Sequence, residues 1–251
     1  MRIGRFSLKG QPFYGLIEGE RIKVLRGFPW PKIELTGEEI PLSQARLLAP
    51  CKPTKIIALG LNYRDHAREL KMPLPEEPLL FLKPPSAVIG PEEKIILPPQ
   101  SKRVDYEAEL AIVIGKKAKN VSIETALDYV LGYTCFNDVT ARDLQQKDGQ
   151  WTRAKGFDTF APIGPWIETE LDPGDLKVEA FLNGERRQSS STKELVFSVP
   201  EIISYVSHIM TLFPGDVIAT GTPPGIGPLQ PGDLIEVRIK GIGDLKNYVS
   251  K

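Results

Sequence analysis

Residues 104–115 read Val-Asp-Tyr-Glu-Ala-Glu-Leu-Ala-Ile-Val-Ile-Gly. Apolar and β-branched residues fill the second half of this stretch, which predicts a central, buried β-strand over residues 105–114. Side chains alternate between the two faces of a strand, so Glu107 and Glu109 are expected to point the same way. Two acids near a buried sheet are costly unless a cation lies between them. The stretch therefore predicts a strand that carries a cation site at its polar end.

A third acid, Asp138, follows a second strand-like run over residues 129–137. Three carboxylates suit the hard cations Mg²⁺, Mn²⁺ and Ca²⁺ and do not suit zinc or copper. Glu107, Glu109 and Asp138 are therefore the predicted metal ligands. Asp105, which lies nearer the start of its strand, ranks below them. The alternative is that the two glutamates line a solvated strand face, which is where exposed glutamates usually lie.

The composition excludes several classes of protein. The chain has 251 residues, of which 41% are hydrophobic, with 32 basic and 32 acidic side chains. Zero formal net charge argues against nucleic acid or an anionic membrane as the main partner. No apolar run reaches the roughly 18 residues of a membrane span, and the first residues do not read as a signal peptide. Cys51 and Cys135 lack metal or redox spacing, so we expect reduced thiols in a cytoplasmic protein.

The order of elements favours a mixed, mainly β (α+β) fold with a small N-terminal β extension at residues 1–50 and a larger catalytic domain at 54–251. Two strand-like runs flank a turn at residues 18–20, which indicates a hairpin in the extension. Further strands are expected at 55–60, 79–82, 94–97, 165–168, 177–182, 216–219 and 234–240. Helices are expected at 62–70, 122–128, 139–146 and 200–212. Many strands with few helices argue against a doubly wound sheet.

Only two histidines are available for acid–base chemistry. His66 and Glu69 lie three positions apart on a predicted helix, so their side chains face each other. A carboxylate beside an imidazole orients the ring and stabilises its protonated form, which is the usual pairing for activating water. The alternative is an ordinary surface ion pair. His208 lies on the polar face of the last predicted helix, where a solvated or interface position is expected.

Residues after the third acid supply candidate substrate contacts. If residues 139–146 are helical, Arg142 and Gln145 project from one side, and Arg142 could hold a substrate carboxylate in bidentate fashion. The alternative for Arg142 is a surface ion pair with Asp138 or Asp143.

Two further segments could reach the same site. Lys155 precedes a glycine and could bring a mobile positive charge to the metal, with plain solvation as the alternative. The glycine-rich loop at 219–227 contains no Walker sequence and opens no predicted helix. It is expected to bring backbone N–H groups and the Thr222 hydroxyl near a ligand.

Several motifs, in this order, resemble the fumarylacetoacetate hydrolase family over about residues 54–250. They are Asn62-Tyr63-Arg64-Asp65-His66, the run 105–109, the run 137–143, Lys155-Gly156-Phe157-Asp158, the run 221–225 and Pro231-Gly232-Asp233. Residues 1–50 resemble the small extension found in the bacterial isomerase and decarboxylase branch. The resemblance implies a β-sandwich roll, usually a homodimer, with a magnesium or manganese site. The chain lacks the large N-terminal barrel of the eukaryotic hydrolases, which argues against their substrate.

The resemblance also implies a role for each candidate residue. The three acids named above match the metal ligands, with Mg²⁺ or Mn²⁺ as the cofactor and Ca²⁺ as a substitute without activity. The matched catalytic positions are His66, Glu69 and Lys155, the first two on a lid segment. The matched substrate-contacting positions are Arg142, Gln145 and Thr222.

The implied chemistry is a metal-stabilised enolate. A 2-oxo acid would chelate the metal through its C1 carboxylate and C2 oxygen, and the same enolate leads to isomerisation, decarboxylation or carbon–carbon bond hydrolysis. The first expectation is 2-hydroxyhepta-2,4-diene-1,7-dioate isomerase, or the linked decarboxylase, in aromatic-compound breakdown. A second carboxylate would be held by Arg142 or Lys155, which favours dioic acids.

Two alternatives stay open. An acylpyruvate hydrolase of the fumarylpyruvate type, or an oxaloacetate decarboxylase, would use the same metal and the same enolate. A non-catalytic, Ca²⁺-stabilised binding module would explain the carboxylates alone. It would not explain why His66, Glu69, Arg142 and Lys155 occur together.

Overall fold

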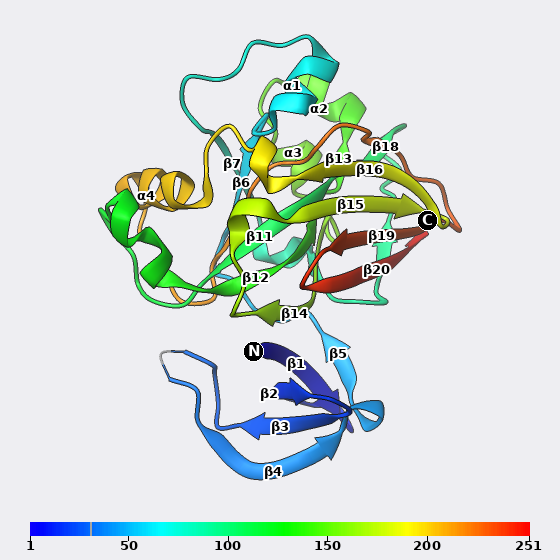
Figure 1. The fold of residues 1–251 in the computed structure, drawn as a ribbon. Helices are drawn as coiled ribbons and strands as arrows, with labels where there is room; N and C mark the ends of the chain where they lie inside the picture. Colours follow the sequence, from blue (N-terminus) through cyan, green and yellow to red (C-terminus); the bar gives the residue numbers. More distant parts are fainter. Residues whose placement is uncertain (31) are drawn as a thin grey trace.

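The computed structural model describes residues 1–30 and 32–251. Strands dominate and the helices are short, so the prediction of a mixed, mainly β fold is confirmed (Figure 1). The helices are α1 (Arg64–Leu70), α2 (Arg142–Asp148), α3 (Thr152–Lys155) and α4 (Val199–Ile209), with 3₁₀ turns η1 (Leu42–Gln44), η2 (Pro85–Ala87), η3 (Ile123–Tyr129), η4 (Pro173–Asp175) and η5 (Thr192–Glu194). None of the helices in these two ranges is long and apolar enough to cross a membrane.

The largest sheet of the described residues has the order β4-β3-β2-β1-β14-β12-β11-β17-β6-β7, with β5 paired to β1 and β8 paired to β14. Its strands are β1 (Arg2–Leu8), β2 (Gln11–Glu18), β3 (Arg21–Leu25), β4 (Leu35–Pro41), β5 (Arg46–Leu48), β6 (Ile56–Gly60), β7 (Leu79–Lys83), β8 (Val88–Ile89), β11 (Ala108–Ile114), β12 (Val130–Asn137), β14 (Ala161–Glu168) and β17 (Val217–Ala219).

Two smaller sheets complete the architecture. One has the order β16-β15-β19-β20-β9, from β16 (Glu185–Ser191), β15 (Lys177–Leu182), β19 (Leu234–Ile239), β20 (Gly243–Ser250) and β9 (Lys94–Ile96). The other has the order β13-β10-β18, from β13 (Thr140–Ala141), β10 (Val104–Tyr106) and β18 (Gly227–Pro228).

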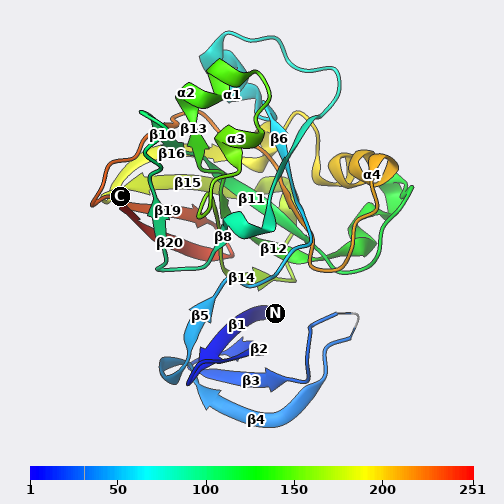
Figure 2. The same ribbon diagram turned by 180° about the vertical axis from the view of Figure 1, so that it is seen from behind.

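The N-terminal strands form a lobe of their own that continues the large sheet. Figures 1 and 2 show β1 to β5 gathered at one end of the molecule, below β14. The link is antiparallel pairing of β1 with β14, where Ile3 lies opposite Ile167. The predicted hairpin in this lobe is confirmed, because β2 pairs with β3 across the turn. The lobe also has its own apolar cluster around Phe6 and Ile22, both fully buried.

The central strand β11 is buried on both faces, as its continuous apolar sequence predicts. Its even-numbered residues, such as Ile112, enter the core between the large sheet and the five-stranded sheet. Its odd-numbered residues, such as Val113, enter a second core on the opposite face. The pleat sends successive side chains to opposite faces, so one short strand anchors two cores. The polar end of β11 is thereby fixed in place from both sides.

The prediction of a single strand at 105–114 is wrong in one respect, because the chain leaves the hydrogen-bonded β-ladder at Glu107. Residues before it form β10, which pairs with β13 and β18, whereas residues after it form β11, which pairs with β12 and β17. The backbone N–H of Glu107 donates instead to the side-chain oxygen of Asn137 at 2.9 Å. A side chain thus replaces the missing ladder partner at the point where the chain changes sheets.

The helix predicted at 139–146 also begins later than expected. Thr140 and Ala141 form the short strand β13 opposite β10, and helix α2 starts only at Arg142. Pairing with β10 satisfies backbone groups that a helix would otherwise use. The other three predicted helices are confirmed. Those predicted at 62–70 and 200–212 are shorter, as α1 and α4, and the one predicted at 122–128 is shifted by one residue, as the 3₁₀ helix η3.

Truncating Ile112 should measure how far the fold depends on β11. We expect Ile112→Ala to lower the free energy of unfolding by about 2–5 kcal/mol, because a fully buried side chain leaves a cavity. The matched control is Ile123→Ala, where the side chain is 49% exposed and the expected loss is about 0.5 kcal/mol or less. Urea unfolding of both variants tests this, and equal losses would contradict the assignment of β11 as the central strand.

Candidate metal centre and active site

Three buried carboxylates converge where β11 begins and β12 ends. Glu107, Glu109 and Asp138 each offer one oxygen, and these oxygens all lie within 4.8 Å of one another. The backbone holds two of them together, because the N–H of Asp138 donates to the carbonyl of Glu107 at 2.9 Å. The structure thus brings together the three predicted ligands, although the predicted strand is broken at the first of them, Glu107.

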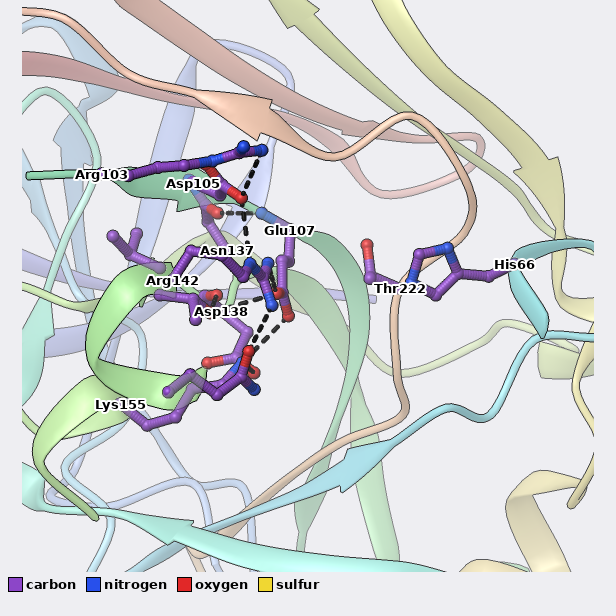
Figure 3. A network of polar contacts seen from close by, with 12 residues as sticks. His66, Arg103, Asp105, Glu107, Asn137, Asp138, Arg142, Lys155 and Thr222 are labelled. Atoms are coloured by element: carbon purple, nitrogen blue, oxygen red, sulfur yellow. Dashed lines mark hydrogen bonds and ion pairs between the residues drawn. The ribbon is translucent and has the colours of Figure 1, made fainter. Parts of the chain in front are cut away.

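Two buried lysines reach this cluster from neighbouring elements, and Figure 3 shows one of them, Lys155. Lys155 at the end of α3 donates to Glu107 Oε2 at 3.0 Å and to Asp138 Oδ2 at 2.5 Å. Lys83 at the end of β7 donates to Asp138 Oδ1 at 2.6 Å and to the carbonyl of Val139 at 3.0 Å. Lys155 is only 2% exposed, so the alternative of plain solvation is wrong.

The two lysines differ in how their surroundings act on the ammonium group. Burial lowers the pKa of Lys83, because Asp138 compensates only part of the lost hydration. Burial also opposes the charged form of Lys155, but Asp138 and Glu107 outweigh it and raise its pKa. Lys155 is therefore the firmly charged partner of the cluster.

Arg142 is engaged by acidic and amide groups on every side-chain nitrogen. Its Nε donates to Asp105 Oδ2 at 3.0 Å, its Nη1 donates to Gln145 Oε1 at 2.6 Å, and its Nη2 forms an ion pair with Glu107. Arg142 and Gln145 therefore lie on one side of α2, as predicted. The alternative of a surface pair with Asp138 or Asp143 is wrong, because the partners are interior acids. Asp105 lies outside the three-acid cluster.

Glu107 and Glu109 lie in opposite electrostatic environments. Burial alone would raise the pKa of Glu107, but Lys155 and Arg142 hold it well below its usual range. Burial raises the pKa of Glu109, and the charges of Asp138 and Glu107 raise it further. Within the described residues Glu109 has no ion pair, and its polar partner is the N–H of Gly221, at 2.9 Å from Oε2. One buried acid therefore lacks a compensating cation.

This arrangement fits a divalent cation. The donors are hard carboxylate oxygens on converging side chains, which is the ligand set that Mg²⁺, Mn²⁺ and Ca²⁺ prefer. Glu109 carries charge that the two lysines and Arg142 do not neutralise. A cation among the three acids would relieve the repulsion that raises the pKa of Glu109. The residues present thus meet the chemical requirement of such a site.

His66 and Glu69 form the predicted pair on α1. The ring Nδ1 of His66 lies 2.9 Å from Glu69 Oε2, and the other oxygen of Glu69 accepts the N–H of Gly225 at 3.2 Å. The imidazole is buried, whereas the carboxylate is 43% exposed. The second histidine, His208, is exposed on α4, and its Nδ1 lies 2.8 Å from the carbonyl of Ser204.

Thr222 lies across the site from Lys155, beside His66 (Figure 3). Its hydroxyl donates to the carbonyl of Ala108 at 2.9 Å and accepts the Nε2 group of Gln188 at 2.9 Å. These bonds tie the 219–227 loop to the start of β11. The loop therefore lies close to the site, as predicted. The Thr222 hydroxyl is hydrogen-bonded to protein groups.

A cavity of about 360 Å³ joins these groups into one site. Of the residues predicted from sequence, those that line it are His66, Glu107, Glu109, Arg142, Gln145, Lys155 and Thr222. Asp138 and Glu69 lie behind them and contact Lys155 and His66, respectively.

Sequence reasoning missed Lys83, Phe81 and Trp151. Lys83 is the last residue of an otherwise apolar strand, where a lysine is expected to mark the solvated end, so its burial could not be anticipated from the pattern. Phe81 and Trp151 are aromatic residues that read equally well as core. Only the fold places Lys83 against Asp138 and both rings along the cavity.

Comparison with known proteins gives a consistent picture. The family model described as fumarylacetoacetate (FAA) hydrolase C-terminal matches residues 55–250, and the one described as Rv2993c-like, N-terminal matches residues 1–50. The structure of 2-hydroxyhepta-2,4-diene-1,7-dioate isomerase from Mycobacterium marinum is similar over 100% of this chain and 98% of its own, with 43% identity and a TM-score of 0.93.

Two further relatives carry other activity names. The mitochondrial oxaloacetate tautomerase Fahd2a of Rattus norvegicus is 45% identical over 84% of this chain and 71% of its own. Maleylpyruvate hydrolase from Sphingobium sp. SYK-6, solved with manganese(II) and pyruvate, is 34% identical over 100% of this chain and 99% of its own, with a TM-score of 0.82. The similar proteins thus include an isomerase, a tautomerase and a hydrolase.

Amide substitutions of the two glutamates should change the stability of EDTA-treated protein in opposite directions. We expect Glu107→Gln to lower the free energy of unfolding by about 3–5 kcal/mol, because Lys155 and Arg142 lose a buried partner. We expect Glu109→Gln to raise it by about 1 kcal/mol or more, because a repelled charge is removed.

The pH dependence of that gain has a definite sign. A carboxyl whose folded pKa is raised contributes stability below its unfolded pKa, and this stability is lost as pH rises through the folded pKa. The advantage of Glu109→Gln over the unsubstituted chain should therefore widen between about pH 6 and about pH 8. Urea unfolding at both pH values measures it, and an advantage that shrinks with rising pH would contradict the electrostatic account.

Proposed function

Because the chain belongs to the fumarylacetoacetate hydrolase family, and is an enzyme of that family, we propose that it interconverts 2-oxo acids and their enol or dienol forms with the help of a divalent metal. The first candidate reaction is isomerisation of a 2-hydroxydienoate such as 2-hydroxyhepta-2,4-diene-1,7-dioate, or the linked decarboxylation. The observation that carries the proposal is the convergence of three buried carboxylates beside a cavity that His66, paired with Glu69, also lines.

We propose Glu107, Glu109 and Asp138 as the ligands of Mg²⁺ or Mn²⁺. When bound, such an ion supplies Lewis-acid stabilisation of negative charge on the oxygens of a 2-oxo acid. Support comes from the relative that was solved with manganese and pyruvate. Ca²⁺ would bind the same oxygens, and we expect it to give no turnover.

The buried lysines and Arg142 would keep the carboxylates ionised and in position to bind a divalent metal ion. Lys155 and Arg142 hold Glu107 in its ionised form, since together they lower its pKa. Lys83 holds Asp138 from behind, and its backbone bond to Val139 fixes the ammonium group in position. Arg142 also aligns Gln145 along the cavity wall. These side chains would therefore position the acids and leave the cavity free for substrate.

His66 is the residue best placed to move a proton. Glu69 holds its Nδ1, which leaves the other ring nitrogen for a substrate or a water molecule. The ring lines the cavity on the side opposite to Arg142 and Lys155 (Figure 3). Isomerisation of a 2-hydroxydienoate to its 2-oxo form removes the proton of the C2 hydroxyl and adds a proton to a chain carbon. It needs a group that both accepts and donates a proton, which imidazole does near neutral pH.

The same pair favours hydrolysis of acylpyruvates as the second candidate function. A histidine oriented by a carboxylate can remove a proton from water as the water attacks a distal carbonyl. Isomerisation needs no such attack, so the substrate that turns over separates the two candidates.

The homodimer, the cytoplasmic location and a place in aromatic-compound breakdown also stay predictions. Sedimentation of the purified protein tests the first of them.

Metal dependence can be checked with two readouts. We expect MgCl₂ or MnCl₂ to raise the melting temperature of EDTA-treated protein and to restore turnover of a 2-hydroxydienoate or an acylpyruvate. Glu109→Gln should lose both effects, because one of three ligands becomes a neutral amide. Full turnover in the presence of EDTA would overturn the proposal.

The two histidines provide a matched pair for testing proton transfer. We expect His66→Asn to lower kcat by about 10²–10⁴-fold, which is the usual contribution of a general acid or base. His208→Asn should leave kcat unchanged, because that exposed ring lies outside the residues that line the cavity. Steady-state kinetics with the substrate that turns over measures both, and equal rates for the two variants would remove His66 from the mechanism.

A further inference from the structure

The cavity wall combines a charged part with a larger apolar part. Glu107, Glu109, Arg142 and Lys155 form the charged part, with Gln145 beside Arg142. The rest of the wall comes mainly from Leu70 and the segment after α1, from β7, and from the start of α3. Its principal side chains are Leu70, Met72, Pro73, Leu79, Phe81 and Trp151. A ligand that fills the cavity therefore meets both charged and apolar side chains.

Two aromatic rings form the firmest part of the apolar wall. Phe81 on β7 and Trp151 before α3 meet edge to face, with ring centroids 5.1 Å apart and planes at 70°. The tip of Trp151 lies against the backbone of Gly60, where an added Cβ would come within 2.9 Å of the ring. Lys155 lies 4.8 Å from the centroid of Phe81. The aromatic part of the wall therefore adjoins the charged side chains.

Both cavity-lining cations are already paired with acids of the protein. Every side-chain nitrogen of Arg142 has a protein partner, and Lys155 is bound by Glu107 and Asp138. Among the described residues that line the cavity, no other lysine or arginine is present. A carboxylate held against the apolar side chains would gain neither a lysine nor an arginine as a counterion, and the hydration it lost there would be costly.

We propose that this cavity selects 2-oxo acids, or their enols, whose group beyond C3 is uncharged and apolar, such as an alkyl, alkenyl or aryl chain. The inference rests on the proposed function, because it takes the carboxylate cluster as the place of the 2-oxo acid head. It points to monoacids in place of the dioic acid named first among the candidate substrates. Each buried methylene of the chain would strengthen binding, whereas a terminal carboxylate would weaken it.

A matched pair of stable ligands tests the preference. N-butyloxamate and N-(3-carboxypropyl)oxamate share the head of a 2-oxo acid and differ in a terminal methyl or carboxylate. We expect calorimetric titration of the Mg²⁺-loaded protein to give at least a tenfold lower Kd for the butyl compound. Equal Kd values, or tighter binding of the carboxylate compound, would overturn the inference.

A charge placed in the apolar wall should reverse the preference. Met72 lines the cavity and is 52% exposed, so Met72→Arg can be accommodated. We expect this variant to bind the carboxylate compound at least tenfold more tightly than the unsubstituted chain does. The control is Leu74→Arg, which adds the same charge to the same segment at a side chain that is 48% exposed and lies outside the cavity lining. An equal gain in both variants would contradict a local effect of the wall.

Binding of unsubstituted oxamate distinguishes a failure of the proposed function from a failure of the apolar selectivity. It carries only the head group, so Mg²⁺-dependent binding of oxamate supports the proposed function whatever the tail preference is. If oxamate and both tailed compounds fail to bind, the proposed function fails. If oxamate binds and the carboxylate tail is preferred, only the apolar selectivity is overturned.

Discussion

The site depends on an incomplete balance of buried charge. Lys155, Lys83 and Arg142 neutralise most of the negative charge of the acids they contact, while Glu109 is left facing Asp138 and Glu107. In surroundings of low polarity this imbalance is expensive for the protein alone and favourable for a divalent cation. The same imbalance explains why the pKa of Glu107 is lowered while that of Glu109 is raised, although the two residues are neighbours in sequence.

The fold fixes the position of the backbone at the start of β11. Strand β11 places alternate side chains in two cores, so the acid at its polar end cannot shift without disturbing both. The break at Glu107 lets the chain pass into the sheet that contains β13 and β18, and Asn137 holds the backbone at the break. Rigid packing on one side and side-chain hydrogen bonds on the other therefore fix the carboxylate cluster to which the proposed chemistry belongs.

On this proposal, the apolar part of the cavity wall determines which substrates the site accepts. Isomerase, tautomerase and hydrolase relatives are all similar to this chain, and a charged head site is compatible with each of those reactions. What distinguishes a substrate is the surface that meets its tail, and here that surface is Phe81, Trp151 and the segment around Met72. Arg142 illustrates the point, because its charge is committed to Asp105 and Glu107 within the protein.

The convergence of the three acids depends on the pairing of β11 with β12, so residue type alone could only name them as candidates. The sequence did predict the mainly β fold, the buried central strand and the histidine–glutamate pair, because short-range periodicity fixes which side chains share a face. It could not locate the break at Glu107, since leaving the ladder depends on Asn137 and on partners in another sheet. It could not reveal Lys83 beside Asp138 or the aromatic wall of Phe81 and Trp151. Those contacts join residues far apart in the chain, and only tertiary packing decides which distant surfaces meet and which charges are neutralised there.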